Sequence, residues 1–223
     1  NFGGTPDGRP IKAIQPGGPL GGILPASCLD LALEPEPFRE QGVLMGSGGL
    51  VVCDDTTCIV DLVTYFEWFA EDESCGRCTT CHGGTQRHVE ILRRIADGKG
   101  RPSDIELMEL LNDALRWSNC FHGQGAPTAV QSLLRHFRDE LIAHIRDKRC
   151  PAGVCKGLIR YEVLPGRERE AGPAAAICQD DGRYAIEDER CIRCDACRQL
   201  QPDVIQVVPA YQPRRALEPV TVG

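Results

Sequence analysis

Four cysteine residues have the spacing of an iron-sulfur site. Cys75, Cys78 and Cys81 follow one another at three-residue intervals, and Cys120 stands alone in the later segment N-C-F-H-G-Q-G-A-P. Three thiolates at this spacing can bind one side of a [4Fe-4S] cluster, and a fourth that the fold brings back completes the coordination. A zinc site of four cysteines usually combines two C-x2-C pairs instead. The pattern therefore predicts a [4Fe-4S] cluster and, with it, electron transfer.

A second cysteine run lies near the other end of the chain. Cys191, Cys194 and Cys197 begin the C-x2-C-x2-C-x3-C-P pattern of ferredoxins, but Gln201 occupies the place of the fourth cysteine. In two-cluster ferredoxins that fourth cysteine binds the other cluster, so loss of one cluster would make it redundant. We expect Cys178 to complete the surviving second [4Fe-4S] site. The alternative is that Cys178 is a buried free thiol, with an external ligand or a three-iron cluster at the site.

A third group of possible ligands has the composition of a zinc site. Cys150 and Cys155 follow soon after His144, and Cys58 at the start of an expected helix could lie nearby. Three cysteines and one histidine form a closed, structural zinc site. Spacing alone leaves open that the C-x4-C pair binds no metal. The remaining two cysteines, Cys28 and Cys53, are expected to be buried free thiols.

The composition limits the class of protein. The chain has 223 residues, 13 cysteines and a net charge of −7, which gives no support for nucleic-acid binding. Clustered cysteines without a signal peptide or an apolar run of eighteen residues favour metal binding in a reducing compartment, the cytoplasm. Because the first residue is Asn1 within a Gly/Pro-rich segment, we interpret the chain as the C-terminal part of a longer polypeptide.

The hydrophobic pattern divides the chain into three segments. Residues 1–45 favour short strands and turns, residues 46–149 favour helices, and residues 150–223 contain the second cysteine run and an expected strand at 203–208. The predicted fold class is therefore α+β and multidomain.

Four helices are expected in the middle segment, over residues 58–70, 85–96, 104–117 and 129–146. They would form a four-helix bundle with Cys75–Cys81 and Cys120 in two of its loops. Trp68 and Trp117 are expected in the bundle core. His82, His88 and His136 are expected to be solvated helix positions, and His122 with the amides of Gly76 and Gly83 could tune a cluster's potential.

The order of motifs resembles a known family. G-R-P-I-K-A-I-Q-P-G-G-P, M-G-S-G-G-L-V-V, E-S-C-G-R-C-T-T-C and N-C-F-H-G-Q-G-A-P occur in this order over residues 1 to about 148. They are similar to the C-terminal part of the flavoprotein subunit of NADH dehydrogenases, the NADH-oxidising subunit of complex I. The added C-P-A-G-V-C-K and ferredoxin-like tail look like the diaphorase subunit of NAD-dependent or electron-bifurcating hydrogenases and formate dehydrogenases.

The resemblance implies a domain plan and cofactors. Residues 1–45 would be the end of a β-grasp-like (SLBB) domain, 46–149 the helical [4Fe-4S] domain, and 150–223 a small ferredoxin-like domain. Zinc between the last two is carried over to Cys58, His144, Cys150 and Cys155. FMN and NAD(H) would bind upstream of this segment. The partners implied are a thioredoxin-like [2Fe-2S] subunit and an iron-sulfur or hydrogenase-like subunit.

Two functional hypotheses follow. In the first, the chain is the iron-sulfur relay of an NADH:acceptor oxidoreductase and passes single electrons between the upstream flavin and partner subunits. In the second, the same metals only staple a structural domain of such a complex. Both expected ligand sets are complete, with Cys178 counted among them, which favours the relay.

A pair of substitutions tests the first ligand set. Cys120→Ser should weaken or abolish the electron paramagnetic resonance (EPR) signal of the helical-domain cluster, because it removes the only remote thiolate of that set. Cys28→Ser should leave the signals of both clusters intact. Loss of a cluster in the Cys28 variant would contradict the assignment.

Overall fold

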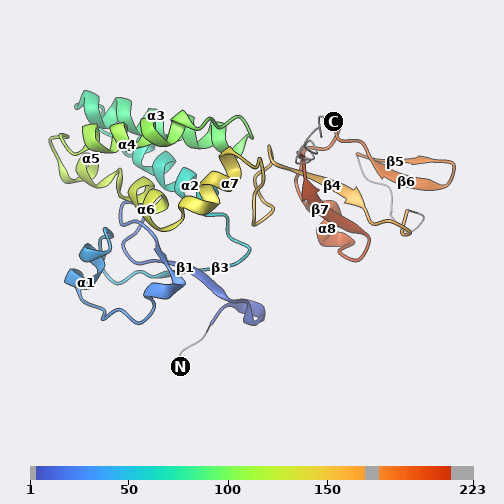
Figure 1. The fold of residues 1–223 in the computed structure, drawn as a ribbon, viewed down its shortest axis with the longest axis horizontal. Coiled ribbons are helices and arrows are strands. Elements are labelled where there is room, and N and C mark those ends of the chain that lie inside the picture. Colours follow the sequence, from blue (N-terminus) through green and yellow to red (C-terminus); the bar gives the residue numbers. More distant parts are fainter. Residues whose placement is uncertain (1–3, 169–175, 212–223) are drawn as a thin grey trace, which may run out of the picture.

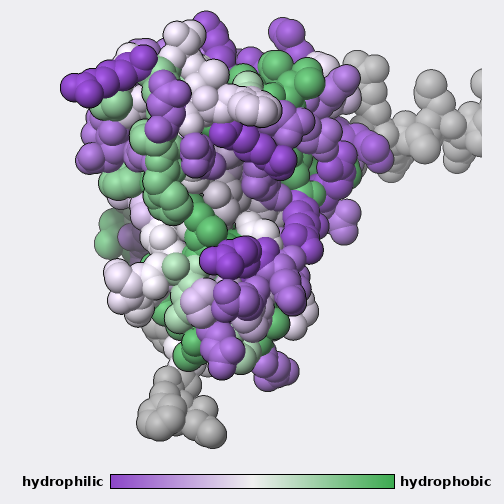
Figure 2. Space-filling model, turned by 90° about the vertical axis from the view of Figure 1, so that its left-hand side faces the viewer, coloured by the Kyte–Doolittle hydropathy of each residue, from purple (hydrophilic) through white to green (hydrophobic). Residues whose placement is uncertain are grey.

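A computed structural model describes residues 4–168 and 176–211 and shows a mixed α+β structure (Figure 1). A small sheet and a group of helices pack together, and the C-terminal strands extend to one side of them. Within the described ranges, no helix has the length and apolarity that a membrane crossing needs. Figure 2 shows the end of the molecule at the left of Figure 1 as a mainly hydrophilic surface crossed by a band of hydrophobic side chains.

The N-terminal part, as described from residue 4 onward, is a three-stranded antiparallel sheet with strand order β2-β1-β3. Its elements are η1 (Pro6–Gly8), β1 (Ile11–Gln15), β2 (Leu24–Pro25), η2 (Ala26–Cys28), α1 (Pro35–Glu40) and β3 (Val51–Asp54). Ile14, Leu24, Phe38 and Val43 form a small core under the sheet. The third strand lies beyond residue 45, so the sheet extends past the boundary expected from the sequence.

The helical part is described without a gap and contains six helices, which share one large core with residues of the tail. They are α2 (Ile59–Asp72), α3 (Thr79–Ala96), α4 (Ser103–Leu115), α5 (Phe121–Gly125), α6 (Thr128–His136) and α7 (Arg138–Ile145). Helices α2 and α3 pack against each other along their length, with the short loop that carries Cys75 between them (Figure 1).

Two helix boundaries differ from the sequence prediction. Helix α3 begins at Thr79 and continues through Gly83 and Gly84, although glycine disfavours a helix interior. Close packing explains one of these glycines, since a Cβ atom on Gly84 would lie 2.9 Å from Leu115 Cδ2. The helix expected over 129–146 is broken at Phe137, which leaves the helical region with φ −128° while its side chain stays buried.

The tail, in its described residues, consists of two antiparallel strand pairs and a short helix. Strand β4 (Ile159–Val163) pairs with β7 (Ile205–Pro209), and β5 (Ile177–Asp180) pairs with β6 (Arg183–Ile186). Helix α8 (Ala196–Leu200) lies against β7. The strand expected after the second cysteine run is confirmed as β7. The core residues Leu158, Ile159 and Ile205 join the tail to the helical part.

Several expectations about single side chains are wrong. Trp117 is 82% exposed and Trp68 41% exposed, so neither lies in the core. His88 is fully buried and lies 3.1 Å from the carboxylate of Glu67. His136 is half-buried and contacts the carbonyl oxygen of Gln41 at 2.9 Å, whereas His82 is exposed as expected. Hydrophobic periodicity does not register such specific partners.

Adjacent glycines of α3 provide a test of the packing between α3 and α4. Gly84→Ala should lower the free energy of unfolding by about 1–2 kcal/mol, because overpacking against Leu115 exceeds the gain in helix propensity. Gly83→Ala, where a Cβ meets nothing within 4 Å, should raise it by up to about 1 kcal/mol. Urea unfolding followed by circular dichroism measures both. Equal effects of the two substitutions would contradict the packing argument.

Candidate metal centres

The four cysteines of the first predicted set line one cavity of about 370 Å³ in the helical part. The cavity lies between the loop that joins α2 to α3 and the start of α5. The structure thus brings Cys120 to the Cys75–Cys81 loop although about forty residues of chain separate them. Its wall is completed by Leu20, Phe69, Glu73, Ser74 and His122.

The ends of helices position these cysteines. Cys78 is the residue directly before α3, and Cys81 lies in the first turn of that helix. Cys120 occupies the same place before α5. Free backbone amides and the positive end of the helix dipole at the start of α3 favour negative charge on thiolates or on a metal cluster. Gly76, with φ +73°, makes the turn between Cys75 and Cys78.

The electrostatics of the cavity depend on whether the thiols are ionised. Burial raises the pKa of the Cys81 thiol, the hydroxyl of Ser74 lowers it, and the neighbouring cysteines, Cys120 first among them, raise it further. Four thiolates so close together would repel one another without a cation. A cluster of iron ions supplies that positive charge, and soft thiolate donors suit iron-sulfur clusters, so the donor set fits a [4Fe-4S] group.

Nearby polar groups include one that sequence reasoning missed. Ser74 Oγ lies 3.5 Å from Cys81 Sγ, and its position directly before Cys75 was the available signal. His122 lines the cavity as expected, but its Nε2 lies 2.9 Å from the carbonyl oxygen of Ala70 and so ties α5 to α2. Gly83 lies beyond the first turn of α3, where an amide bonds within the helix.

A close approach of α5 to α3 shapes the cavity. A Cβ atom on Gly123 would lie 2.5 Å from Ser118 Cβ and 3.0 Å from Cys81 Cβ, and the first of these distances is one that real Cβ atoms do not tolerate. Gly125, two residues further along α5, meets only Leu20 Cβ at 3.7 Å, an ordinary contact. The glycine at position 123 therefore allows Cys120 to reach Cys81.

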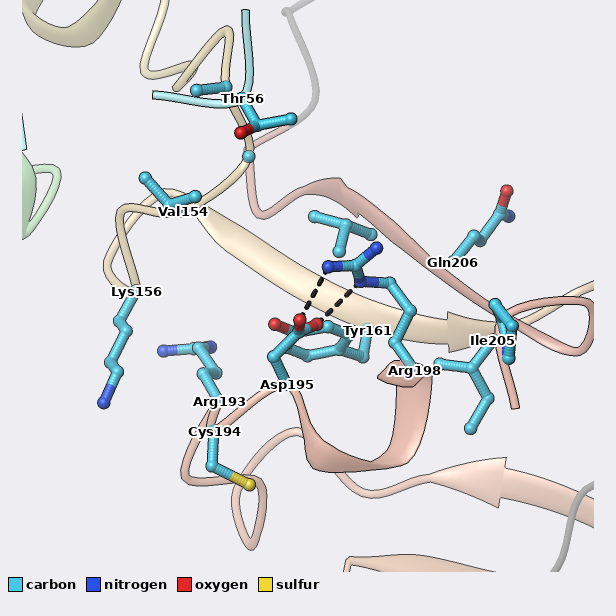
Figure 3. Close-up of a pocket in the computed structure, with 14 residues that line it drawn as sticks. Thr56, Val154, Lys156, Tyr161, Arg193, Cys194, Asp195, Arg198, Ile205 and Gln206 are labelled. Carbon is cyan, nitrogen blue, oxygen red and sulfur yellow. Dashed lines mark hydrogen bonds and ion pairs between the residues drawn. The ribbon is translucent and has the colours of Figure 1, made fainter. Parts of the chain in front are cut away.

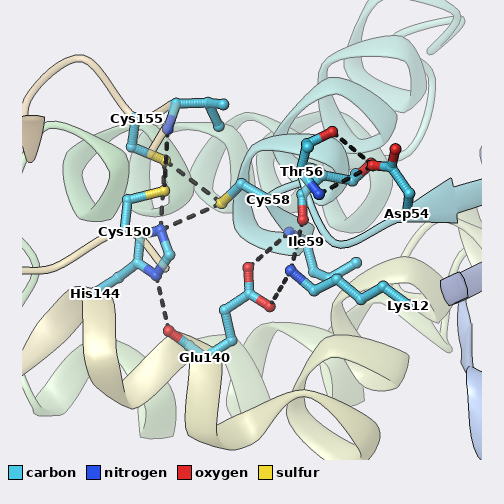
Figure 4. A network of polar contacts seen from close by, with 11 residues as sticks. Lys12, Asp54, Thr56, Cys58, Ile59, Glu140, His144, Cys150 and Cys155 are labelled. Carbon is cyan, nitrogen blue, oxygen red and sulfur yellow. Dashed lines mark hydrogen bonds and ion pairs between the residues drawn. The ribbon is translucent and has the colours of Figure 1, made fainter. Parts of the chain in front are cut away.

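Cys58, His144, Cys150 and Cys155 form a second group, and all four are buried (Figure 4). Their ligand atoms lie within 4.8 Å of one another. His144 Nε2 is 3.3 Å from Cys58 Sγ and 3.4 Å from Cys155 Sγ, and these two sulfurs are 3.5 Å apart. Zinc bonds of about 2.0–2.3 Å in a tetrahedron give ligand separations of about 3.3–3.8 Å. The donors and their spacing fit a zinc ion.

The surroundings of this group orient its histidine. His144 Nδ1 lies 2.8 Å from the carbonyl oxygen of Glu140, which accepts the ring N–H and leaves Nε2 free to bind a metal. The Glu140 carboxylate accepts the amide of Ile59 at 2.9 Å and pairs with Lys12 at 2.8 Å. Through these contacts, visible in Figure 4, β1, α2 and α7 meet beside the four ligands.

The thiols of this group share their protons unequally. Hydrogen bonds from Cys155 and Cys58 lower the pKa of the Cys150 thiol. The same contacts with Cys150 raise the pKa values of Cys58 and Cys155. The metal-free arrangement is therefore one thiolate held by two thiols. A divalent ion would displace the remaining protons, so binding becomes weaker as pH falls.

The second cysteine run forms a tight loop in the tail. Arg193 and Asp195, the residues on either side of Cys194, have left-handed backbones with φ +54° and +66°. These turns bring Cys197 close to its two predecessors: burial raises the pKa of the Cys197 thiol, and Cys191 and Cys194 raise it further. Left-handed backbone is costly for an arginine, which is usual only where the surroundings enforce it.

A cavity of about 690 Å³ borders this loop (Figure 3). Cys194 and Arg193 lie on its wall with Lys156, and Asp195 pairs there with Arg198 at 2.6 Å.

Cys178 lies on the neighbouring hairpin. Its Sγ accepts a hydrogen bond from Arg190 at 3.2 Å, and a contact with Glu187 raises its pKa. The carbonyl oxygen of Glu187 in turn accepts the amide of Cys191 at 3.0 Å, so Cys178 is connected to the cysteine loop through that residue. Cys53 is buried and Cys28 half-buried, and both are free thiols.

A helical domain that gathers four cysteines in one cavity defines the class of iron-sulfur domains. Residues 61–144, which contain all four, match the model of the NADH-ubiquinone oxidoreductase-F iron-sulfur binding region. This part of the chain belongs to that family.

Relatives of known class share much of the chain. The NADP-reducing hydrogenase subunit HndC of Solidesulfovibrio fructosivorans is 40% identical over 177 residues, which cover 79% of this chain and 36% of HndC. An F-type NADH-quinone oxidoreductase subunit of Rhizobium meliloti is 39% identical over 150 residues, 67% of this chain and 36% of that protein. The chain thus spans about a third of the length of these relatives.

A solved structure supports the same relationship. The crystal structure of an NAD+-reducing [NiFe]-hydrogenase in the H2-reduced state matches with a TM-score of 0.54 and 33% identity, over 62% of this chain and 24% of that chain. The chain is therefore related to NADH-oxidising subunits of oxidoreductase complexes.

Two glycines of α5 test how the first cavity is built. Gly123→Ala should lower the iron bound by the helical part severalfold, because the added methyl group pushes α5 away from Cys81. Gly125→Ala should retain the iron, since its Cβ makes only an ordinary contact. Iron per chain and the EPR signal measure the difference. Full iron in the Gly123 variant would refute this role.

Proposed function

We propose that this chain is the iron-sulfur electron-relay portion of an NADH:acceptor oxidoreductase flavoprotein subunit of the hydrogenase or formate-dehydrogenase type. The carrying observation is the convergence of Cys75, Cys78, Cys81 and Cys120 on one cavity within the iron-sulfur region. A [4Fe-4S] cluster bound there would accept and release single electrons. The four thiolates hold it, and Ser74 and the start of α3 offset its negative charge.

In this proposal the group of Cys58, His144, Cys150 and Cys155 holds a structural zinc ion. Four buried ligands leave no open position for substrate, which suits a closed site. The ligands come from the start of α2, from α7 and from the loop before β4. Zinc would therefore fasten the helical domain of residues 46–149 to the tail of residues 150–223.

The tail would carry a second [4Fe-4S] cluster on Cys191, Cys194, Cys197 and Cys178, and we propose a ferredoxin-like role for it. The convergent loop and the link through Glu187 support this proposal. The match to HndC covers 79% of the chain and so includes residues after 150. Residues 1–45 would be the remnant of a β-grasp-like (SLBB) domain, and the helices a bundle around the first cluster.

The wider complex is proposed from the relatives. Their names describe NADH-quinone oxidoreductase and hydrogenase subunits. FMN and NAD(H) would bind in a part that this chain does not include. A thioredoxin-like [2Fe-2S] subunit and an iron-sulfur or hydrogenase-like subunit would be the partners, in the cytoplasm.

Metal content tests the proposal. Anaerobically prepared protein should contain about eight iron, about eight sulfide and about one zinc per chain. Cys150→Ser should lose most of the zinc and keep the iron, while Cys53→Ser, a matched buried thiol outside the group, should keep both. About four iron would remove the tail cluster from the proposal. Iron that no reductant can reduce would indicate a purely structural role.

A further inference from the structure

A fully buried ionisable pair lies between α2 and α3. The side chains of Glu67 and His88 are both 0% exposed, and His88 Nδ1 lies 3.1 Å from Glu67 Oε2. The outer atoms of the pair, Glu67 Oε1 and His88 Nε2, are also buried and have no hydrogen-bond partner in the described part of the chain. Replacing such a pair with apolar side chains is often neutral or stabilising, so its presence in a helix interface calls for an explanation beyond stability.

The pair lies on the same side of α3 as the cluster cavity. Cys81, Thr85 and His88 follow at helical intervals of four and three residues, and all three are buried. Seven residues of α-helix separate Cys81 from His88 by about 10.5 Å along the axis. On α2, Glu67 lies one turn before Ala70, whose carbonyl oxygen contacts His122 of the cavity wall. Buried protein fills the space between, where charges act on each other with little screening.

Within the described residues, His88 is the charged partner of Glu67. Burial raises the pKa of the Glu67 carboxyl, and His88 lowers it by its charge and its hydrogen bond. The other buried or half-buried titratable groups on the packed helices are bound elsewhere: Asp104 to Arg94, Glu140 to Lys12, His144 within the zinc-type group, His122 to the carbonyl of Ala70, and His136 to the carbonyl of Gln41. Apart from half-buried Glu71, the remaining charged side chains of these helices are exposed.

We propose that Glu67 and His88 hold one exchangeable proton whose affinity depends on the redox state of the cluster bound by Cys75, Cys78, Cys81 and Cys120. This inference rests on the proposed relay function. With its proton the pair is neutral overall, and without it the pair carries one negative charge. Added negative charge on the cluster therefore strengthens proton binding. When one electron enters from a one-electron reductant, one proton passes from water to the pair.

The sign of the pH dependence follows from this balance. At low pH the pair keeps its proton in both redox states, and the midpoint potential is constant. As pH rises through the point where the oxidised protein loses the proton, reduction must recover it, so the potential falls. Each tenfold fall in proton concentration then lowers the potential by at most about 59 mV for a one-electron couple.

The experiment is an EPR-monitored redox titration of the cluster-loaded protein at a series of pH values, with dithionite as reductant. The helical-domain signal is identified by its loss in Cys120→Ser. The wild type should show the falling potential, and Glu67→Gln and His88→Gln should flatten it. Asp72→Asn is the matched control, because Asp72 is an exposed carboxylate on α2, nearer to the cysteine loop. It should leave the slope unchanged.

The outcomes separate this inference from the proposed function. Absence of the cluster signal would overturn both. A signal with a pH-independent potential, or with the same slope in the Glu67 variant, would overturn the inference alone. If the variants do not fold, infrared difference spectra of the wild type decide. A buried carboxyl or imidazole band that changes on reduction supports the inference, and its absence overturns it.

Discussion

Mutual repulsion of thiolates is the constraint on which the arrangement of this molecule depends. Cysteines must be held close together before a metal is bound, and the fold does this with backbone rather than with compensating cations. At the first cavity, the start of α3 points toward the sulfurs and Gly123 lets α5 approach Cys81. The described side chains around it are mainly apolar or neutral, and among them Glu73 is the one acidic group on the wall.

The second group solves the same problem by sharing protons and by joining distant segments. Glu140 contributes twice: its carbonyl orients His144, and its carboxylate binds the first amide of α2 and the ammonium group of Lys12. The N-terminal sheet, the helices and the tail therefore meet at one point. A change in any of the three reaches the ligands directly, without a long pathway of weak contacts.

The sequence was informative where covalent chemistry dictates spacing. Cysteines 75, 78, 81 and 120, and the Cys58, His144, Cys150 and Cys155 group, were found from residue types and intervals with the help of the resemblance, and the structure brings each set together. Periodicity could not place Trp117 on the surface or His88 in the interior, because both choices depend on which helix faces which. It also missed the break at Phe137, where tertiary packing overrides helix propensity.

The contact between Cys58 and Cys155 closes a loop in which the two residues are 97 positions apart. Loop closure is costly in chain entropy, and it must wait until both ends have been synthesised. All four cysteines of the first cavity lie inside that loop, and α2 and α3, which flank the segment with three of them, are neighbours in sequence. During synthesis the inner site can therefore assemble from local contacts first. The outer group then acts as a late fastening, made only after the chain has passed residue 155.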